Sequence, residues 1–231
     1  MYKLYAFVSI LLAAGAALAA DGPVDRWAKA VGGREKVAAI KSVYREGTLQ
    51  FGGMTGSIKV WRTADGRYRK EEQLGSYSSI ETFDGTNGIV RLGPGAPRKL
   101  DGAELGVALS KSFANWSAVF FVFFPERRHG NLRIDGDAIA FQPEGGIEWL
   151  VTLDPQTSLP QTMTHKEGDV TITVSFVSYE TVDGFTFEKE IRRTAGDPRL
   201  DASIQFTKTV IDAPVDASLF SLEPAPAATT K

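Results

Sequence analysis

The chain has 231 residues, a formal net charge of −2 and no cysteine. This charge leaves no basic surplus for binding nucleic acid. The lack of cysteine excludes disulfide bonds, thiolate chemistry and a lipid-bearing cysteine. We therefore expect a fold that is held together by its hydrophobic core alone.

The first twenty residues have the pattern of an export signal. Lys3 gives a short positive region, the apolar run from Leu4 to Leu18 follows it, and the tripeptide ending at Ala19 has the small-x-small form of a cleavage site. The apolar run of roughly 15 residues is too short to cross a hydrocarbon core of about 30 Å comfortably. We therefore expect a signal peptide over residues 1–20, cleavage near Ala19, and a periplasmic mature protein without an integral membrane span.

The remainder of the chain is predicted to form a single domain over residues 21–222. About 210 residues remain after cleavage, which is enough for one good-sized hydrophobic core. The tail over 223–231, EPAPAATTK, is rich in Pro, Ala and Thr. We expect this tail to be disordered, because it has too few large apolar residues to pack.

A helical pattern opens the domain, from about Val24 to Lys41. The adjacent glycines Gly32 and Gly33 lie in the middle of this pattern, and paired glycines favour a turn. The sequence therefore predicts a helical segment with a break at these two residues.

Most of the domain has the pattern of β-strands. In the run from Val170 to Tyr179, for example, Ile172 and Val174 alternate with threonines, which is the period of a sheet with one buried face. Asp-Gly pairs at 65–66, 84–85, 135–136 and 183–184 separate such runs and are typical of tight hairpins between antiparallel strands. The runs with β character are 43–51, 56–63, 68–73, 79–83, 88–92, 132–134, 138–142, 148–153, 161–166, 170–179, 184–191 and 203–210.

The fold class that follows is mainly β, with about ten or eleven antiparallel strands, and so many strands must curl into a barrel or split into a sandwich. In the run 184–191 the alternation places Phe185, Phe187 and Ile191 on one face and Glu188 on the other.

A second helical pattern runs from about Ala103 to Phe124. One stripe of apolar residues follows it at spacings of 4, 4, 3, 4 and 4, as expected for one face of an α-helix: Leu105, Leu109, Phe113, Trp116, Phe120 and Phe124. From Trp116 onward the other faces become apolar as well. The pattern predicts one helix that begins amphipathic and ends apolar on all sides.

The apolar end of this helix, Trp116 to Phe124, allows three interpretations. As a membrane span it would cover about 13–14 Å at ~1.5 Å per residue, which is less than half a bilayer. As a core helix it would pack on the concave side of a curled sheet. As the cover of a partly open barrel, its aromatic side chains would line a ligand cavity, and the candidate lining residues are Phe113, Trp116, Phe120, Phe121 and Phe124.

A basic turn follows the apolar segment directly, at Arg127, Arg128 and His129. It is either a solvated loop between helix and strand or a polar mouth. As a mouth it would contact the phosphate or carboxylate headgroup of a ligand whose chains lie under the aromatic helix.

The sequence shows no catalytic, nucleotide or metal motif. His129 and His165 have no other ligand at helical or hairpin spacing, so we expect each to be an exposed turn or strand residue. Glu71 and Glu72 are adjacent on a strand, so they face opposite ways and do not converge on one substrate atom, and we expect both to be solvated. We therefore expect no cofactor, no metal and no enzymatic activity.

Several stretches of the chain have the form of motifs from one family of exported proteins. They are a helix running into a strand, a strand-turn-strand, an Asp-Pro…Leu-Pro turn, a Val-Asp-Gly hairpin and a closing Pro-Val-Asp…Leu-Phe segment: AVGGREKVAAIKSVYREGTL (30–49), FDGTNGIV (83–90), VTLDPQTSLPQ (151–161), YETVDGFTFEKEIR (179–192) and DAPVDASLF (212–220). On these motifs the chain resembles the LolA/LolB-like superfamily of periplasmic lipoprotein carriers, in particular its outer-membrane lipoprotein-sorting protein relatives. It departs from them at Glu188, where family members often have proline, and no motif assigns the carriers' interior arginine to a particular residue.

The resemblance implies an incomplete, strongly curved antiparallel β-barrel with covering α-helices and an apolar cavity for acyl chains. The expected function is an exported, non-catalytic carrier or binder of a lipid or lipidated protein, with an envelope protein as a possible partner. The alternatives are an envelope structural or protein-interaction module without a ligand cavity, and a hydrolase acting on envelope polymers. A hydrolase would need polar groups that converge inside the curve of the sheet, where the alternation places mostly apolar residues.

Overall fold

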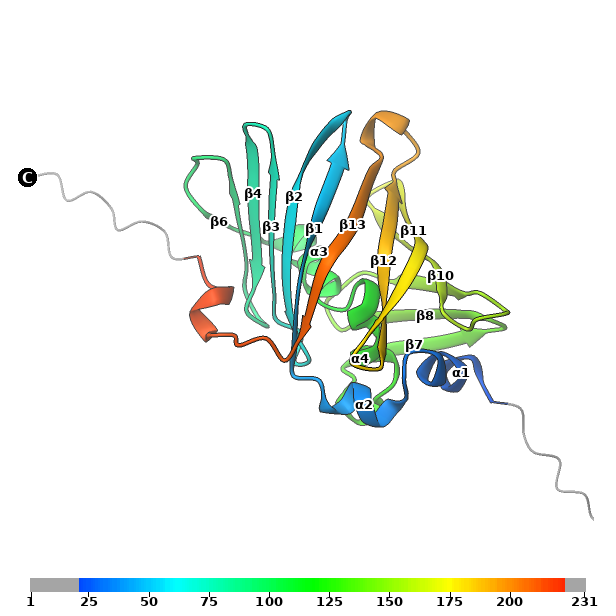
Figure 1. Cartoon of the computed structure of the whole chain (residues 1–231). Helices are drawn as coiled ribbons and strands as arrows, with labels where there is room; N and C mark the ends of the chain where they lie inside the picture. The colour runs from blue at the N-terminus through cyan, green and yellow to red at the C-terminus, as the bar shows by residue number, and fades with distance from the viewer. Residues whose placement is uncertain (1–20, 223–231) are drawn as a thin grey trace, which may run out of the picture.

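A computed structural model of the protein describes residues 21–222 (Figure 1). The expected signal peptide (1–20) and the expected disordered tail (223–231) lie outside the described residues. The described chain forms one antiparallel sheet of 13 strands in the order β6-β5-β4-β3-β2-β1-β13-β12-β11-β10-β9-β8-β7. The predicted class, a mainly β fold built on one curled and unclosed antiparallel sheet, is therefore confirmed.

The strands follow one another mostly as hairpins, and only β1 and β13 join distant parts of the chain. Their bounds are β1 Ser42–Phe51, β2 Met54–Thr63, β3 Tyr68–Leu74, β4 Tyr77–Phe83, β5 Gly88–Leu92, β6 Arg98–Lys99, β7 Gly130–Asp135, β8 Ala138–Pro143, β9 Trp149–Leu153, β10 Pro160–Glu167, β11 Val170–Val182, β12 Phe185–Thr194 and β13 Ala202–Ile211. The strand number differs from the predicted ten or eleven. The two-residue strand β6, for example, is too short to produce a pattern of alternation.

Short helical elements accompany the sheet. They are α1 Pro23–Ala30, α2 Arg34–Ala39, α3 Gly102–Lys111, α4 Ala118–Val122 and the 3-10 turns η1 Asn115–Ser117, η2 Pro125–Arg127, η3 Pro198–Leu200 and η4 Ala217–Phe220. The predicted break between α1 and α2 is present at Gly32 and Gly33. A side chain on Gly32 would place its Cβ 2.3 Å from the backbone oxygen of Gly184, so the β11–β12 turn approaches α1 only because position 32 is glycine.

The prediction of one continuous helix over 103–124 is wrong. Asn115 has a left-handed φ of 56°, which separates α3 from η1 and α4. The Ser117 hydroxyl lies within hydrogen-bond distance of two freed carbonyls, the backbone oxygens of Ser112 at 2.9 Å and Ala114 at 2.7 Å, and its single hydrogen can be donated to either. The apolar stripe therefore continues across two elements that point in different directions.

Within residues 21–222, no single helix has the length and apolar character to cross a membrane. The one helix pair that meets this test together, Gly102–Lys111 with Asn115–Val122, is bent by 80°.

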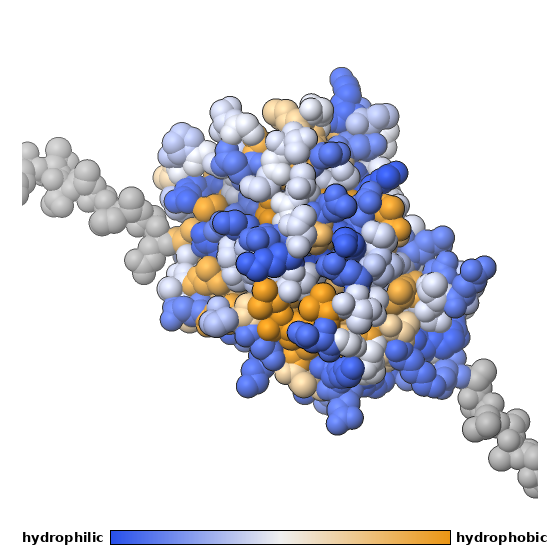
Figure 2. All heavy atoms as spheres, viewed as in Figure 1, coloured by the Kyte–Doolittle hydropathy of each residue, from blue (hydrophilic) through white to orange (hydrophobic). Residues whose placement is uncertain are grey.

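The sheet curls around α3, η1 and α4, which together form the helical cover of its concave face (Figure 1). Helix α3 contacts both β5 and β8, so it spans the gap between the two ends of the sheet. The main core lies between these helices, α1 and the strands β8 to β12. It includes Trp27, Phe123 and Phe141. Figure 2 shows the opposite, outer face as mostly hydrophilic, with apolar residues gathered near its lower centre.

Candidate ligand-binding cavity

A cavity of about 540 Å³ lies on the concave face, between the sheet and the helical cover. This volume falls in the range of about 300–1,000 Å³ that is typical of small-molecule sites. The helical cover contributes Lys111, Ala114, Asn115 and Trp116 to its lining. Strands from both halves of the sheet contribute the rest.

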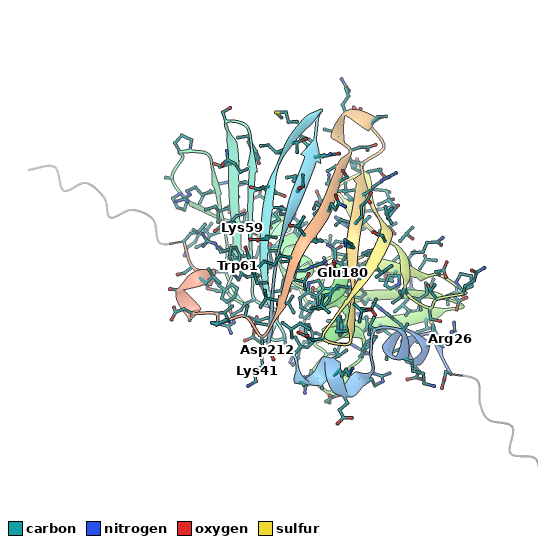
Figure 3. The ribbon with its side chains drawn as sticks, viewed as in Figure 1. Arg26, Lys41, Lys59, Trp61, Glu180 and Asp212 are labelled. Carbon is teal, nitrogen blue, oxygen red and sulfur yellow. The ribbon has the colours of Figure 1, made fainter. Side chains whose placement is uncertain are left out.

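One wall of the cavity is apolar. Ile58 and Val60 of β2 face it, while Lys59 and Trp61, labelled on the same strand in Figure 3, alternate with them. Trp61 packs against Tyr44 with ring centroids 4.8 Å apart, away from the cavity. This apolar wall, the surface formed by β1 to β3, β12 and β13, consists of Leu49, Phe51, Met54, Ile58, Val60, Leu74, Ile191, Ala202, Ile204 and Phe206.

A buried ion pair lies beside this wall. Nη1 of Arg45 is 2.9 Å from Oε1 of Glu188, and Nε of Arg45 donates to the Thr209 hydroxyl at 3.1 Å. Burial lowers the pKa of Arg45 and raises the pKa of Glu188, although the neighbouring guanidinium of Arg45 acts against the second shift. Arg45 nevertheless stays charged, because the guanidinium is protonated at every accessible pH.

Glu188 is buried and lines the cavity together with Ile191, although the alternation predicted these two residues on opposite faces of β12. The pairing of β12 with β11 has a register shift here, in which Lys189 has no partner between Glu188 and Glu190. Phe187 packs against Trp116 with ring centroids 5.5 Å apart, and Glu188 contacts Arg45. Strand alternation alone could not reveal this irregularity, which brings Glu188 to the face of Ile191.

Arg62 connects the sheet to the helical cover. The residue is 8% exposed; Nη1 donates to the backbone oxygen of Lys111 and lies 3.4 Å from the Ser117 hydroxyl. Burial lowers the pKa of Arg62. A charged donor thus satisfies a carbonyl at the point where α3 ends.

The charged side chains of a second polar group, on β3, β4 and α3, form ion pairs with one another. Nζ of Lys70 lies 3.0 Å from Oε1 of Glu72, and Nζ of Lys111 lies 3.4 Å from Oε1 of Glu81. Glu71 instead pairs with Arg69 at 2.6 Å and does not line the cavity. The predicted divergence of Glu71 and Glu72 is therefore present, but Glu72 lines the cavity, whereas the sequence analysis expected it to be solvated.

A third polar group, on β9 and β10, is formed by Trp149, His165 and Glu167. Trp149 and His165 are cross-strand partners whose rings lie 4.0 Å apart, and His165 Nε2 is 3.0 Å from Glu167 Oε1. The expectation that His165 is exposed is wrong, because only 6% of it is accessible beneath Trp149 and the cavity lining. The hydrogen bond from His165 lowers the pKa of Glu167 to about 2, with a further contribution from Lys111.

The residues predicted to line a cavity are divided between several places. Trp116 lines the 540 Å³ cavity. Phe113, Phe120 and Phe121 line a separate pocket of about 480 Å³ on the other side of the helical cover, where Phe120 and Phe121 also belong to the main core. Phe124 is 8% exposed and packs in that core.

The predicted basic mouth is also divided. Arg127 and His129 are exposed and line the 480 Å³ pocket. Arg128 donates from Nε to the backbone oxygen of Phe121 at 2.9 Å and from Nη2 to that of Val122 at 2.6 Å. It therefore caps the C-terminal end of α4.

Four polar residues that line the cavity were not predicted from the sequence as site residues, namely Arg45, Arg62, His165 and Glu188. A signal was present for Arg62, because it continues the alternating series of Ile58 and Val60 and must face the same side. In the described ranges, the structure holds no group of three His, Asp or Glu side chains placed to bind a metal ion.

Comparison with known proteins shows which solved structures have a similar fold. No protein-family model matches the chain, and no curated protein matches it. Among solved structures, it is similar to a DUF1329 family protein of Desulfovibrio piger, at 14% identity over 86% of this chain and 95% of that chain, with a TM-score of 0.52. It is also similar to a LolA superfamily protein of Nitrosomonas europaea, at 10% identity over 86% of this chain and 96% of that chain, with a TM-score of 0.51.

A putative outer membrane lipoprotein-sorting protein domain of Vibrio parahaemolyticus matches at 8% identity over 78% of this chain and 88% of that chain, with a TM-score of 0.47. The predicted resemblance to the LolA superfamily is confirmed by the first two structures, at the level of the fold. At these identities the similarity shows the fold alone.

Proposed function

We propose that the protein is an exported, non-catalytic carrier or binder of lipidic ligands, which it holds in the 540 Å³ cavity. The observation that carries this proposal is the apolar wall on the inside of the curled sheet. Apolar burial contributes about 0.8 kcal/mol per CH₂ group, so one long chain against this wall supplies substantial affinity.

The periplasm is the proposed location, on the basis of the signal-like residues 1–20 and the LolA-like fold. The ligand is a lipid or a lipidated protein, and an envelope protein is the proposed donor or acceptor. The helical cover would move to release the ligand, since it lies over the cavity and is attached to β2 through Arg62.

One observation supports the hydrolase alternative: the carboxylates of Glu72, Glu167 and Glu188 all line the cavity. Each of them, however, is already paired with a basic side chain, namely Lys70, His165 and Arg45 respectively. A general acid or base needs a proton-transfer path to the substrate. The paired state of all three carboxylates favours binding over hydrolysis.

The proposal is tested by equilibrium binding of a fluorescent fatty acid to the purified protein. Ile204 lines the cavity and is half-buried, so Ile204→Trp fills part of the space. Val177 is 46% exposed and provides a matched control, Val177→Trp. We expect Ile204→Trp to weaken binding at least about tenfold, and Val177→Trp to leave it unchanged. A wild-type protein that binds no fatty acid would instead support the interaction-module alternative.

A further inference from the structure

Some of the polar atoms that line the 540 Å³ cavity have hydrogen-bond partners in the protein, and others have none. Trp149 Nε1 and His165 Nδ1 are buried and have no hydrogen-bond partner among the described residues. An indole N–H can only donate, and a buried donor without an acceptor costs about 1–3 kcal/mol. Both side chains line the cavity, so an acceptor group on a ligand would satisfy a donor that the protein leaves unpaired.

The cavity lining also contains more cationic than anionic side chains. Five cationic side chains line the cavity, namely Arg45, Arg62, Lys70, Lys111 and Arg193, against the three carboxylates of Glu72, Glu167 and Glu188. Within residues 21–222, neither Arg62 nor Arg193 has a carboxylate within ion-pair distance. A buried or half-buried cation without a counter-ion is stabilised by an anion brought in by the ligand.

The unpaired groups other than Arg62, which lies on β2, gather near Glu167. Lys111 and Arg193 both lie close enough to Glu167 to lower its pKa, and Glu167 is hydrogen-bonded to His165. Trp149, His165, Lys111 and Arg193 therefore lie around Glu167 in one region, which we name the polar subsite. It holds two lining cations against one lining carboxylate, and Lys111 also pairs with Glu81 at 3.4 Å. Most of the apolar wall lies on β1 to β3 and β13, and it reaches β12, the strand of Arg193, only at Ile191.

We propose that the polar subsite binds the anionic headgroup, a carboxylate or a phosphate, of an amphiphile whose single acyl chain lies against the apolar wall. This inference rests on the proposed carrier function and specifies the class of its ligand. The cavity volume of about 540 Å³ suits one chain, since sites of about 300–1,000 Å³ hold drug-sized ligands.

The test compares three ligands with the same chain: laurate, dodecyl phosphate and the neutral dodecanol, each measured by displacement of a fluorescent fatty acid below micellar concentration. We expect an anionic ligand to bind about tenfold more tightly than dodecanol, which corresponds to one charge-assisted hydrogen bond. Tighter binding of dodecyl phosphate than laurate assigns the subsite to phosphate, and the reverse order assigns it to carboxylate. Equal affinity for all three overturns the subsite while leaving the carrier function intact. Failure of all three to bind refutes the carrier function itself.

Two pairs of variants locate the effect. Trp149→Phe removes the indole N–H and keeps an aromatic ring beside His165, and Trp61→Phe on the outer face of β2 is its control. Arg193→Gln removes a lining cation, and its neighbour Arg192, whose side chain is 64% exposed, provides Arg192→Gln as the control. We expect Trp149→Phe and Arg193→Gln to reduce the preference for the anion over dodecanol by about threefold or more, and the controls to retain it. An unchanged preference in both lining variants would overturn the assignment.

Discussion

Arg45 and Glu188 form a nearly solvent-free ion pair, with side chains that are 1% and 3% exposed and charged atoms 2.9 Å apart. The guanidinium carbon of Arg45 also lies 3.6 Å from the ring centroid of Phe206, which belongs to the apolar wall. The pair joins β1 to β12, two strands that are separated in the sheet by β13. It thereby passes over β13, the middle strand of the sheet, on the side that lines the cavity.

Removing one partner of this pair is expected to be more harmful than removing both. Glu188→Ala removes the nearer counter-ion of the buried Arg45 and leaves only Glu180, at 3.9 Å. Breaking a buried pair in this way costs up to about 3–5 kcal/mol. The double variant Arg45→Met/Glu188→Leu removes both charges and should recover most of that loss. Urea unfolding followed by circular dichroism measures the difference. A double variant that is less stable than Glu188→Ala would contradict this account of the pair.

The pairing of Glu167 with His165 predicts a pH-dependent contribution to stability. The pKa of Glu167 is lowered from 4.5 to about 2 in the folded protein. A lowered carboxyl pKa contributes stability that is fully present above about pH 4.5 and is lost as the pH falls towards about 2. Glu167→Gln should therefore destabilise the protein at pH 7, and the difference from wild type should shrink between pH 4.5 and 2.

The control for this prediction is Glu35→Gln, a change at an exposed residue of α2. Its effect on the free energy of unfolding should be small and independent of pH in the same range. A Glu167→Gln variant with a pH-independent deficit would show that the lost contribution is packing rather than charge.

Substitution of Phe120 tests whether this residue packs in the core or lines the ligand site. It is 5% exposed, belongs to the main core and does not line the 540 Å³ cavity. We expect Phe120→Ala to lower the free energy of unfolding by about 3–5 kcal/mol, as is typical of a packed phenylalanine, while the affinity for laurate stays the same. Thermal unfolding and laurate titration on the same sample measure both. A larger loss of affinity than of stability would return Phe120 to the ligand site.

Arg62 is expected to control the opening of the helical cover. Arg62→Met removes a charged donor from the backbone oxygen of Lys111, and hydrogen bonds to charged groups contribute about 1.5–3 kcal/mol. Amides of residues 111–117 should then exchange with deuterium faster than in wild type, and bound fatty acid should dissociate faster. Arg67→Met, on the neighbouring turn and paired with Asp65, should change neither rate. Equal exchange in both variants would remove Arg62 from this role.

The outline of the fold could be predicted because its signals are local. Alternation predicted the strands, Asp-Gly pairs such as Asp183-Gly184 predicted hairpins, and Gly32-Gly33 predicted the break between the first helices. The break at Asn115 could not be predicted, because the apolar stripe keeps its helical spacing through it. What ends α3 there includes a tertiary contact from Arg62, 49 residues away in the chain.

The candidate site was harder to predict for the same reason. Arg45 and Glu188 are 143 residues apart, and nothing near either residue in the sequence indicates a partner. His165 was expected to be exposed because it has no metal-ligating neighbour, but Trp149 on the adjacent strand covers it. The aromatic residues near Phe120 were the most conspicuous feature of the sequence, and most of them pack in the core.

The most direct test of the central claim is native mass spectrometry of the protein expressed with its complete N-terminal segment and purified without detergent. The carrier account predicts a population with the added mass of one lipid per chain. The bound lipid should be extractable into organic solvent, and the population should be lost in Ile204→Trp and retained in Val177→Trp. A wild-type protein that shows only its bare mass, and still shows only that mass after incubation with fatty acid, would contradict the account.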